Sequence, residues 1–279
     1  MNSRRNFLRL AGAAALTAGA TPLFSSSPKQ ESKEKKPHAF TLGMAGYTFR
    51  EFTVEQTIAM MKRVGVTNLS VKDFHMPMNS TSSQIAEVIG KFKAGGINVY
   101  TVGVIYMKTP ESVDQAFGYA KMAGVNMIVG APDYELLPYV EQKVKSSGIR
   151  LAIHNHGPDN PLYPNATDIW NHIKDLDSQI GICLDIGHTL RDGQNINADL
   201  IKYKSRIYDI HIKDVNKASK EGTTVEIGRG IIDIPGFIET LGKINYQGSC
   251  SLEFEKDMKD SLPGIAESIG YFKGVMACG

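Results

Sequence analysis

Short apolar runs alternate with amphipathic stretches from about residue 40 to the C-terminal end of the chain. The runs are rich in β-branched residues, which is typical of buried strands, whereas the amphipathic stretches have the apolar spacing of helices. Four stretches end at a glycine that precedes an aliphatic residue, at Gly65-Val66, Gly96-Ile97, Gly124-Val125 and Gly148-Ile149. Glycine suits a left-handed helix end because any Cβ would clash there. These glycines recur every 24 to 31 residues, which is the period of a strand followed by a helix.

The pattern predicts eight strands and eight helices in alternation. The expected strands lie near Thr41–Thr48, Asn68–Asp73, Asn98–Ile105, Asn126–Gly130, Arg150–Asn155, Gly181–Ile186, Ile207–Ile212 and Gly248–Phe254. The expected helices lie near Val54–Val64, Ser82–Ala94, Glu111–Ala123, Tyr134–Ser146, Thr167–Lys174, Ala198–Lys204, Pro235–Leu241 and Pro263–Met276. Eight such pairs favour an α/β fold closed into a parallel (β/α)8 TIM barrel. An open doubly wound sheet is disfavoured because no Gly-x-Gly-x-x-Gly motif follows the first strand.

The first 25 residues have the composition of an export signal. Arg4 and Arg5 precede a weakly apolar run from Leu10 to Phe24, which resembles a twin-arginine signal. A membrane anchor is the alternative, but this run of about 15 residues is shorter than the roughly 20 that span a bilayer. Residues 26–38 are polar and Lys-rich, as in a disordered linker, and residues 39–279 remain for the barrel. The mature protein is therefore expected in the periplasm, without stable membrane insertion once the signal is cleaved.

The charge of the chain is close to balanced. The formal net charge is +2, but three of the 31 basic residues lie in the expected signal, which leaves 28 basic against 29 acidic residues. This balance argues against a nucleic-acid partner. The three cysteines, Cys183, Cys250 and Cys278, show no Cys-x-x-Cys spacing and are too few for a disulfide framework. The oligomeric state is left open, with a homodimer as one option.

Polar side chains gather where the predicted strands end. The segments are Lys72 to His75, His154 to His156, Asp185 to His188, His211 with Lys213 and Asp214, and Glu253 to Glu255. Barrel enzymes carry their active sites at the C-terminal ends of the strands. A single histidine at a strand end could equally be a hydrogen-bonded residue at the rim of the barrel. Burying several ionisable groups together costs free energy, however, unless they form ion pairs or bind a shared ion. Imidazole and carboxylate ligands suit Zn²⁺, Mn²⁺, Fe²⁺ or Co²⁺.

Five segments in the second half of the chain carry a more specific likeness. They are residues 151–156 (LAIHNH), 184–188 (LDIGH), 209–214 (DIHIKD), 227–233 (IGRGIID) and 251–254 (SLEF). These segments resemble the sugar phosphate isomerase/epimerase family, the xylose-isomerase-like barrels that include D-tagatose 3-epimerase and the inosose isomerases and dehydratases. The first half of the chain matches this family only in its layout.

The resemblance implies one divalent metal ion, Mn, Zn, Co, Fe or Mg, held by four side chains. In the family a glutamate after strand five, an aspartate after strand six, a histidine on strand seven and a glutamate on strand eight bind the ion. Asp185, His211 and Glu253 match three of these positions, and His154 stands where the family has the first glutamate. This departure disfavours a symmetrical epimerisation between two glutamates, and His154 is interpreted as the fourth ligand.

The resemblance also implies the substrate site. His188 and Arg229 match substrate-binding positions of the family, and His75, His156 and Lys213 are further candidates for contacts with substrate. Glu253, His154 and His188 are the candidates for catalytic proton transfer. Lys72, at the end of strand two, is a weaker candidate.

The expected function is that of a divalent-metal-dependent isomerase, epimerase or lyase acting on a sugar or keto-sugar derivative through a metal-stabilised enediolate. Export favours an unphosphorylated substrate such as an oxidised glycoside. One alternative is a carbohydrate-binding barrel without catalysis, in which the metal is structural. Another is the related AP-endonuclease chemistry on DNA, which the neutral charge and the export signal disfavour.

Overall fold

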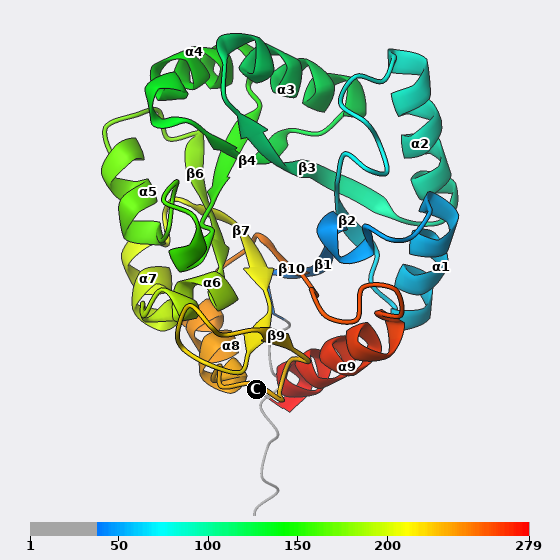
Figure 1. Ribbon diagram of the computed structural model, residues 1–279, viewed down its shortest axis with the longest axis vertical. Coiled ribbons are helices and arrows are strands. Elements are labelled where there is room, and N and C mark those ends of the chain that lie inside the picture. Colours follow the sequence, from blue (N-terminus) through cyan, green and yellow to red (C-terminus); the bar gives the residue numbers. More distant parts are fainter. Residues whose placement is uncertain (1–37, 279) are drawn as a thin grey trace, which may run out of the picture. The chain divides into compact units, whose positions relative to one another are not determined.

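The computed structural model describes residues 38–278, which form a closed barrel of eight parallel strands surrounded by helices (Figure 1). The barrel strands are β1 (Thr41–Ala45), β2 (Asn68–Val71), β3 (Asn98–Met107), β4 (Met127–Pro132), β5 (Arg150–His154), β6 (Ile180–Asp185), β7 (Ile207–Ile212) and β10 (Ser249–Leu252). Each strand pairs with its sequence neighbours, and β10 closes the barrel against β1. The predicted TIM barrel is confirmed.

The helices lie outside the strands and follow them in sequence. They are α1 (Val54–Val64), α2 (Ser82–Ala94), α3 (Pro110–Ala123), α4 (Leu137–Ser147), α5 (Ala166–Ile173), α6 (Ile186–Arg191), α7 (Ile196–Tyr203), α8 (Ile234–Lys243) and α9 (Leu262–Cys278). The first three begin with reciprocal capping boxes at Thr53, Thr81 and Thr109. Each threonine hydroxyl accepts an N–H that the helix leaves unpaired, which stabilises the helix start by about 1 kcal/mol.

The four glycines that the sequence placed at helix ends all adopt left-handed backbone conformations. Their φ angles are 64° at Gly65, 78° at Gly96, 72° at Gly124 and 70° at Gly148. An L-residue with a Cβ is strained in this region, so glycine is what allows the chain to leave the helix and enter the next strand. The repeat seen in the sequence is therefore a repeat of helix ends.

Some elements differ from the expected ones. The first strand ends at Ala45 and continues as a 3-10 helix, η1 (Gly46–Phe49). Helix α6 was not expected, because residues 185–188 were interpreted as the end of a strand and its rim. After β7 the chain forms a small antiparallel hairpin of β8 (Asp214–Val215) and β9 (Thr224–Val225). All three differences lie near the ends of barrel strands, where loops determine local structure.

The loop after β9 is held by the carboxylate of Asp214. Its oxygens accept hydrogen bonds from the backbone N–H groups of Gly228, Gly230 and Ile232 at 3.0 to 3.1 Å. A Cβ at Gly230 would collide with this carboxylate. The motif residues Asp214 and Gly230 therefore stabilise the shape of the loop.

Apolar side chains fill both the barrel and the layer between strands and helices. The larger group of buried residues lies mainly between the sheet and the helix ring, and a smaller group inside the barrel includes Val104, Val129 and Cys183. His38, which the sequence placed in the linker, donates from Nε2 to the Met276 carbonyl at 3.2 Å and so lies against α9. The predicted signal and the rest of the linker lie outside the described residues. Within residues 38–278, no helix combines the length and apolar character needed to cross a bilayer.

Candidate active site

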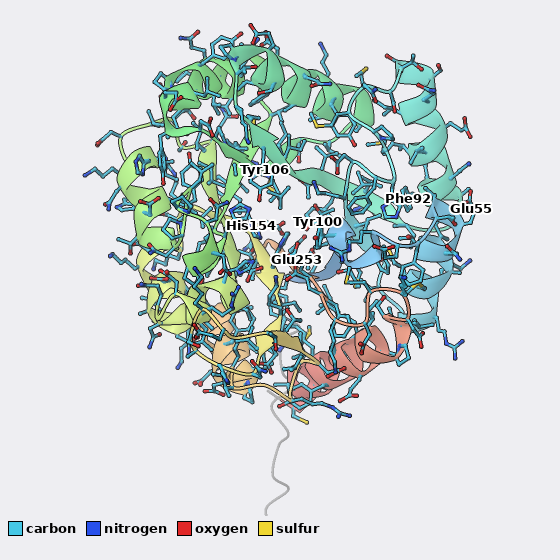
Figure 2. All side chains as sticks on the ribbon, viewed as in Figure 1. Glu55, Phe92, Tyr100, Tyr106, His154 and Glu253 are labelled. Atoms are coloured by element: carbon cyan, nitrogen blue, oxygen red, sulfur yellow. The ribbon has the colours of Figure 1, made fainter. Side chains whose placement is uncertain are left out.

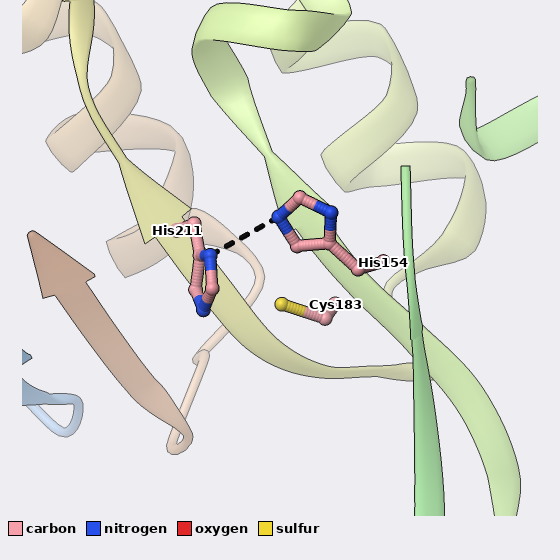
Figure 3. Close-up of side chains that lie close together, drawn as sticks. All are labelled: His154, Cys183 and His211. Carbon is pink, nitrogen blue, oxygen red and sulfur yellow. Dashed lines mark hydrogen bonds between the residues drawn. The ribbon is translucent and has the colours of Figure 1, made fainter. Parts of the chain in front are cut away.

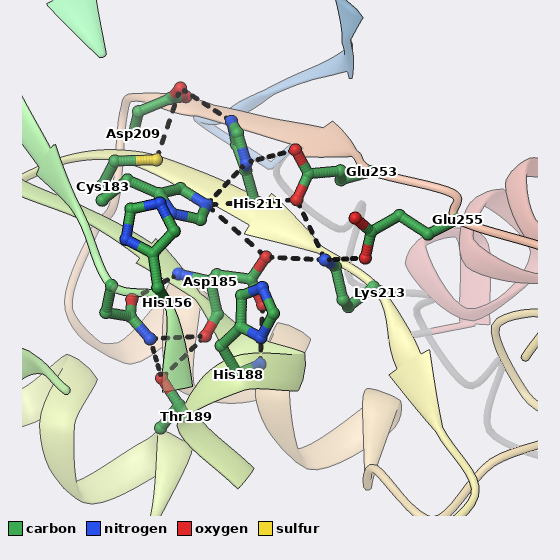
Figure 4. A network of polar contacts seen from close by, with 12 residues as sticks. His156, Cys183, Asp185, His188, Thr189, Asp209, His211, Lys213, Glu253 and Glu255 are labelled. Carbon is green, nitrogen blue, oxygen red and sulfur yellow. Dashed lines mark hydrogen bonds and ion pairs between the residues drawn. The ribbon is translucent and has the colours of Figure 1, made fainter. Parts of the chain in front are cut away.

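Four buried side chains from neighbouring strands meet at the C-terminal mouth of the barrel (Figure 4). His154 ends β5, Asp185 ends β6, His211 lies near the end of β7, and Glu253 directly follows β10. Each of the four offers one nitrogen or oxygen atom, and these atoms all lie within 4.8 Å of one another. The barrel thus gathers the four residues expected to bind a metal, although 99 residues of sequence separate the first from the last.

The distances within this cluster are short. His154 Nε2 lies 3.1 Å from His211 Nδ1, 3.6 Å from Asp185 Oδ2 and 4.0 Å from Glu253 Oε2. His211 Nδ1 lies 3.4 Å from Glu253 Oε1. The two imidazoles therefore direct ring nitrogens toward one another and toward both carboxylates.

Asp185 has one oxygen engaged in the fold and one directed at the cluster. Its Oδ1 accepts the backbone N–H of His188 at 2.7 Å and so caps helix α6. Asn155 fixes the same residue from β5, because its side-chain oxygen accepts the Asp185 N–H at 2.8 Å. The second oxygen, Oδ2, is buried and faces the cluster, with His154 Nε2 at 3.6 Å and Lys213 Nζ at 3.1 Å. The unexpected helix α6 thus positions this carboxylate.

A fully buried lysine occupies the other side of the two carboxylates. Lys213 Nζ lies 3.1 Å from Asp185 Oδ2, 2.9 Å from Glu253 Oε2 and 2.8 Å from Glu255 Oε2. Its aliphatic stem passes over Gly187, where any Cβ would overlap the lysine carbons. The lysine therefore supplies a fixed positive charge beside the cluster, and Gly187 makes room for it.

Charge pairing sets the protonation of the carboxylates. Burial alone would raise the pKa of Glu253, but the Lys213 ammonium and the His211 imidazole outweigh it and hold that pKa well below its ordinary value of 4.5. Burial opposes ionisation of Asp185 as well, and Lys213 with His188 nevertheless lowers its pKa. Both carboxylates are therefore ionised at neutral pH.

Two more histidines lie beside the cluster and stay neutral. Burial lowers the pKa of His156 to about 3, with a further contribution from His154. Burial also lowers the pKa of His188 to about 4, against the opposing charge of Asp185. Neutral imidazoles can donate from one nitrogen and accept at the other, which suits contacts with hydroxyl and carbonyl groups.

Neighbouring side chains orient these two histidines. Arg191 Nη1 donates to His188 Nδ1 at 3.2 Å. A guanidinium has only donors, so Nδ1 is the unprotonated nitrogen and Nε2 carries the hydrogen. His156 Nε2 lies 2.6 Å from the hydroxyl of Tyr106 in a hydrogen bond. Arg191 itself is held by Asp159 and by the carbonyl of Lys220.

A cavity of about 330 Å³ opens above the cluster. Tyr106, His154 and Glu253, three of its lining residues, are labelled in Figure 2. Its lining combines carboxylate, imidazole and phenol groups. The lining residues are Tyr47, Lys72, Val104, Tyr106, His154, His156, His188, Glu253 and Glu255. The cavity has space for a small polar molecule in contact with the cluster.

Two residues that the sequence suggested for substrate binding lie elsewhere. His75 is buried beside α1, where its Nε2 bonds the Phe52 carbonyl at 3.0 Å and the Thr57 hydroxyl at 3.3 Å. Arg229 is exposed and forms an ion pair with Glu267 on α9. The structure does not bring either residue to the cavity, so a contact with substrate at these two positions has no geometric support.

Tyr106 and Glu255 line the cavity but were not among the expected site residues. Tyr106 lies near the end of β3, a strand whose polar residues gave no signal because its expected end was Ile105. Glu255 reaches the cluster from the segment after β10, because its Oε2 lies 2.8 Å from Lys213 Nζ. If the third strand had been expected to end at Met107 instead of Ile105, Tyr106 would have been recognised as a polar residue at a strand end.

The cluster fits a divalent first-row metal ion. Separations of 3.1 to 4.0 Å between its ligand atoms approach the edge of about 3.4 Å of a tetrahedron with bonds near 2.1 Å. Asp185 Oδ2 is buried and lies 3.6 Å from His154 Nε2, so it faces the same space as the imidazole nitrogens, as a ligand atom would. Two imidazoles and two carboxylates are also a donor set that Zn²⁺, Mn²⁺, Fe²⁺ and Co²⁺ accept.

The fold and the cluster define a TIM barrel with a metal-ligand constellation at its mouth. A family model described as a xylose isomerase-like TIM barrel matches residues 134–275, about half of the chain, and the protein belongs to that family. This match includes all four residues of the cluster.

Individual relatives match about half of the chain. Rhizopine catabolism protein MocC of Rhizobium meliloti is 25% identical in an alignment of 146 residues that covers 47% of this chain and 44% of that protein. Inosose dehydratase of Clostridium beijerinckii is 28% identical in an alignment of 142 residues that covers 46% of each chain. The chain thus spans less than half the length of these curated relatives. The structure of 3-keto-D-glucoside 4-epimerase from E. coli shares the fold, with a TM-score of 0.68, 16% identity, and coverage of 84% of this chain and 99% of that one.

Proposed function

We propose that this protein is a divalent-metal-dependent enzyme that acts on a sugar or keto-sugar derivative, as an isomerase, epimerase or lyase. The observation that carries the proposal is the position of the four-residue cluster directly beneath a cavity of about 330 Å³. Two of the cluster residues, His154 and Glu253, also line that cavity. A purely structural ion would not need to lie beside a cavity with polar walls.

His154, Asp185, His211 and Glu253 would hold the ion. When bound, it would supply Lewis-acid polarisation of a substrate carbonyl, which acidifies the adjacent C–H group. His188 presents Nε2–H as a donor to a substrate oxygen, because Arg191 engages its other nitrogen. The ionised Glu253 carboxylate lines the cavity and accepts the proton from carbon. Lys213, at 2.9 Å, keeps that carboxylate ionised and in position.

The fate of the abstracted proton separates the reaction classes. Return to the same carbon from the other face is epimerisation, return to the neighbouring carbon is isomerisation, and loss of a β-substituent is elimination. His156, paired with Tyr106 at 2.6 Å, is the second group that can exchange protons with a substrate oxygen. The related inosose dehydratase and the 3-keto-D-glucoside 4-epimerase are named for elimination and epimerisation respectively, so both outcomes belong to the proposal.

An unphosphorylated substrate agrees best with the charges around the cavity. Lys72 lines the cavity, but its ammonium already forms an ion pair with Asp73 at 3.0 Å and donates to the Val104 carbonyl at 2.7 Å. Lys213 is likewise surrounded by three carboxylates. Export to the periplasm, predicted from residues 1–25, would place the enzyme where such a sugar is met.

Hydrogen exchange tests this proposal. The protein, loaded in turn with Mn²⁺, Zn²⁺ and Co²⁺, is incubated with keto-sugars and keto-glycosides in deuterated water, and carbon-bound hydrogen is followed by NMR. Exchange by the wild type and by the surface variant Glu239→Gln, with loss in Glu253→Gln, is the expected result. Saturable sugar binding without any exchange in the wild type would overturn the enzymatic proposal and establish a carbohydrate-binding barrel.

A further inference from the structure

Three aromatic side chains lie on a side of the barrel mouth that contributes nothing to the metal-ligand cluster. Tyr47 belongs to η1 after β1, Phe74 to the loop after β2, and Tyr106 to the end of β3. These strands are neighbours in the barrel, whereas the cluster comes from β5, β6, β7 and β10 (two of its imidazoles are drawn in Figure 3). The family match covers residues 134–275, so what the three aromatic residues bind is not implied by the family.

The three aromatic rings are only partly covered by the fold. Phe74 is 41% exposed and Tyr106 is 46% exposed, and Tyr47 is half-buried. Tyr47 and Tyr106 line the cavity above the cluster, and Phe74 packs beside Tyr47 with 6.2 Å between the ring centroids. Exposed aromatic side chains that gather at the rim of a polar cavity indicate a ligand-binding surface, whereas scattered ones do not.

The loop that presents Phe74 is anchored by His75. The backbone N–H of His75 donates to the Lys72 carbonyl at 3.0 Å, and its Nε2 bonds the Phe52 carbonyl at 3.0 Å. The buried imidazole also packs edge-on against Phe74, with 5.1 Å between the ring centroids. The sequence motif of residues 72–75 therefore positions an aromatic ring at the mouth.

The hydroxyl groups of the two tyrosines are engaged by neighbouring side chains. Arg50 Nη1 donates to the Tyr47 hydroxyl at 2.5 Å. The Tyr106 hydroxyl forms its hydrogen bond of 2.6 Å with His156 Nε2. Each tyrosine is thus held at its polar end, which leaves the ring itself for contact with a ligand.

The cavity has space for one sugar ring. Its volume of about 330 Å³ is at the lower end of the roughly 300 to 1,000 Å³ of small-molecule sites. A second ring joined to this sugar would lie outside the cavity, against the aromatic side chains at its rim. The negative face of an aromatic ring attracts C–H groups, which carry a small positive charge in sugars and at the edges of planar rings.

We propose that Tyr47, Phe74 and Tyr106 form an outer subsite for the second ring of a glycoside. The substrate is then a keto-sugar that is joined through its glycosidic bond to another ring, which is a second sugar or an aromatic aglycone. The inference rests on the proposed function for the position of the first sugar in the cavity. It does not depend on any catalytic step.

Binding of unoxidised glycosides measures this subsite without turnover, because these compounds lack the carbonyl group that the reaction needs. The full chain, incubated with Zn²⁺, is titrated by calorimetry with the methyl, hexyl and phenyl β-D-glucopyranosides and with methyl β-cellobioside. We expect the phenyl glucoside or the cellobioside, which carry a second ring, to bind on the order of tenfold more tightly than the methyl glucoside. The hexyl glucoside adds apolar carbon without a ring and should gain less.

Phe74→Ala should remove most of this gain, so that the Kd of the glycosides with two rings rises toward that of the methyl glucoside. The matched control is Tyr271→Ala, because Tyr271 is also 41% exposed but lies on α9, and this variant should keep the gain. If Phe74→Ala fails to fold, NMR of the wild-type complex decides the question. Protons of the second ring should then shift upfield, as they do over an aromatic face, and unchanged shifts would overturn the subsite.

The outcomes separate this inference from the proposed function. Equal affinity for all four glycosides, or binding of none, would overturn the subsite. A gain of the same size with the hexyl glucoside would also overturn it, because the surface would then recognise apolar carbon and not a ring. A gain for two rings without carbon-hydrogen exchange on keto-sugars would retain the subsite and refute the enzyme, and exchange without such a gain would do the reverse.

Discussion

His154 Nε2 lies 3.1 Å from His211 Nδ1, although the two residues belong to strands β5 and β7, which are not adjacent. The intervening strand β6 contributes Asp185 above this pair and Cys183 on its inner side. Two facing ring nitrogens can form at most one hydrogen bond between them, and an ion between or beside them would use both. The pair is therefore the centre of the proposed metal site.

Replacing Lys213 with methionine should destabilise the metal-free protein. The change leaves Asp185 and Glu253 as buried carboxylates without their cation, which costs about 3 to 5 kcal/mol of unfolding free energy. A divalent ion can replace the lost charge, so added Zn²⁺ or Mn²⁺ should raise the melting temperature of Lys213→Met more than that of the wild type. Differential scanning fluorimetry with and without metal measures both effects.

Lys72→Met is the matched control for this prediction. Its ion pair with Asp73 reaches solvent, since the Asp73 side chain is 47% exposed, so its loss should cost less than about 1 kcal/mol. Equal metal-dependent shifts in the wild type and in Lys213→Met would contradict the idea that Lys213 and the ion share the carboxylates.

Asp214→Ala should loosen the loop of residues 228–232. Three backbone N–H groups of this loop and the N–H of Val215 lose their acceptor, and the expected cost is on the order of 3 kcal/mol of unfolding free energy. Asp233→Ala removes a carboxylate that caps α8 through one N–H, from Gly236, and should cost about 1 kcal/mol. Urea denaturation compares the two, and an Asp214→Ala variant no less stable than Asp233→Ala would refute the structural role of this motif residue.

Asp199 on α7 should make stability depend on pH. Burial raises its pKa from the ordinary 3.8 to about 6, despite the opposing charge of Lys202. The folded state thus holds a proton that the unfolded state releases, so the contribution of Asp199 to stability is fully present below about pH 4 and is lost as the pH rises toward 6. Asp199→Asn removes this group, and its melting temperature relative to the wild type should increase between pH 4 and 6 and then level off. A difference that does not vary with pH would contradict the shifted pKa.

Much of the fold could be predicted because the repeated glycines have a physical cause. Gly65, Gly96, Gly124 and Gly148 mark helix ends that require a left-handed backbone, and each is visible in the sequence without an alignment. Helix α6 could not be predicted in the same way, because its six residues follow a strand without a break and its cap is Asp185, a residue that also looks like a ligand. Short helices capped by functional residues give no separate signal in the apolar pattern.

The cluster itself could be predicted from strand ends, but its environment could not. Once the eight strands are placed, parallel topology brings His154, Asp185, His211 and Glu253 to one mouth. The burial of Lys213 against two of these carboxylates depends on the absence of a side chain at Gly187, and the position of Cys183 beside His154 depends on the register between β5 and β6. Such contacts across strands are set by register, which the apolar pattern leaves undetermined.

Metal content is the direct test of a metal centre built by His154, Asp185, His211 and Glu253. Elemental analysis of the purified full chain, after dialysis and reloading, is compared with the alanine variant of each of the four residues, and circular dichroism verifies that each variant is folded. We expect about one divalent ion per wild-type chain and a marked loss in every variant that folds. A wild-type protein that retains no divalent ion after reloading would show that these four residues do not form a metal centre.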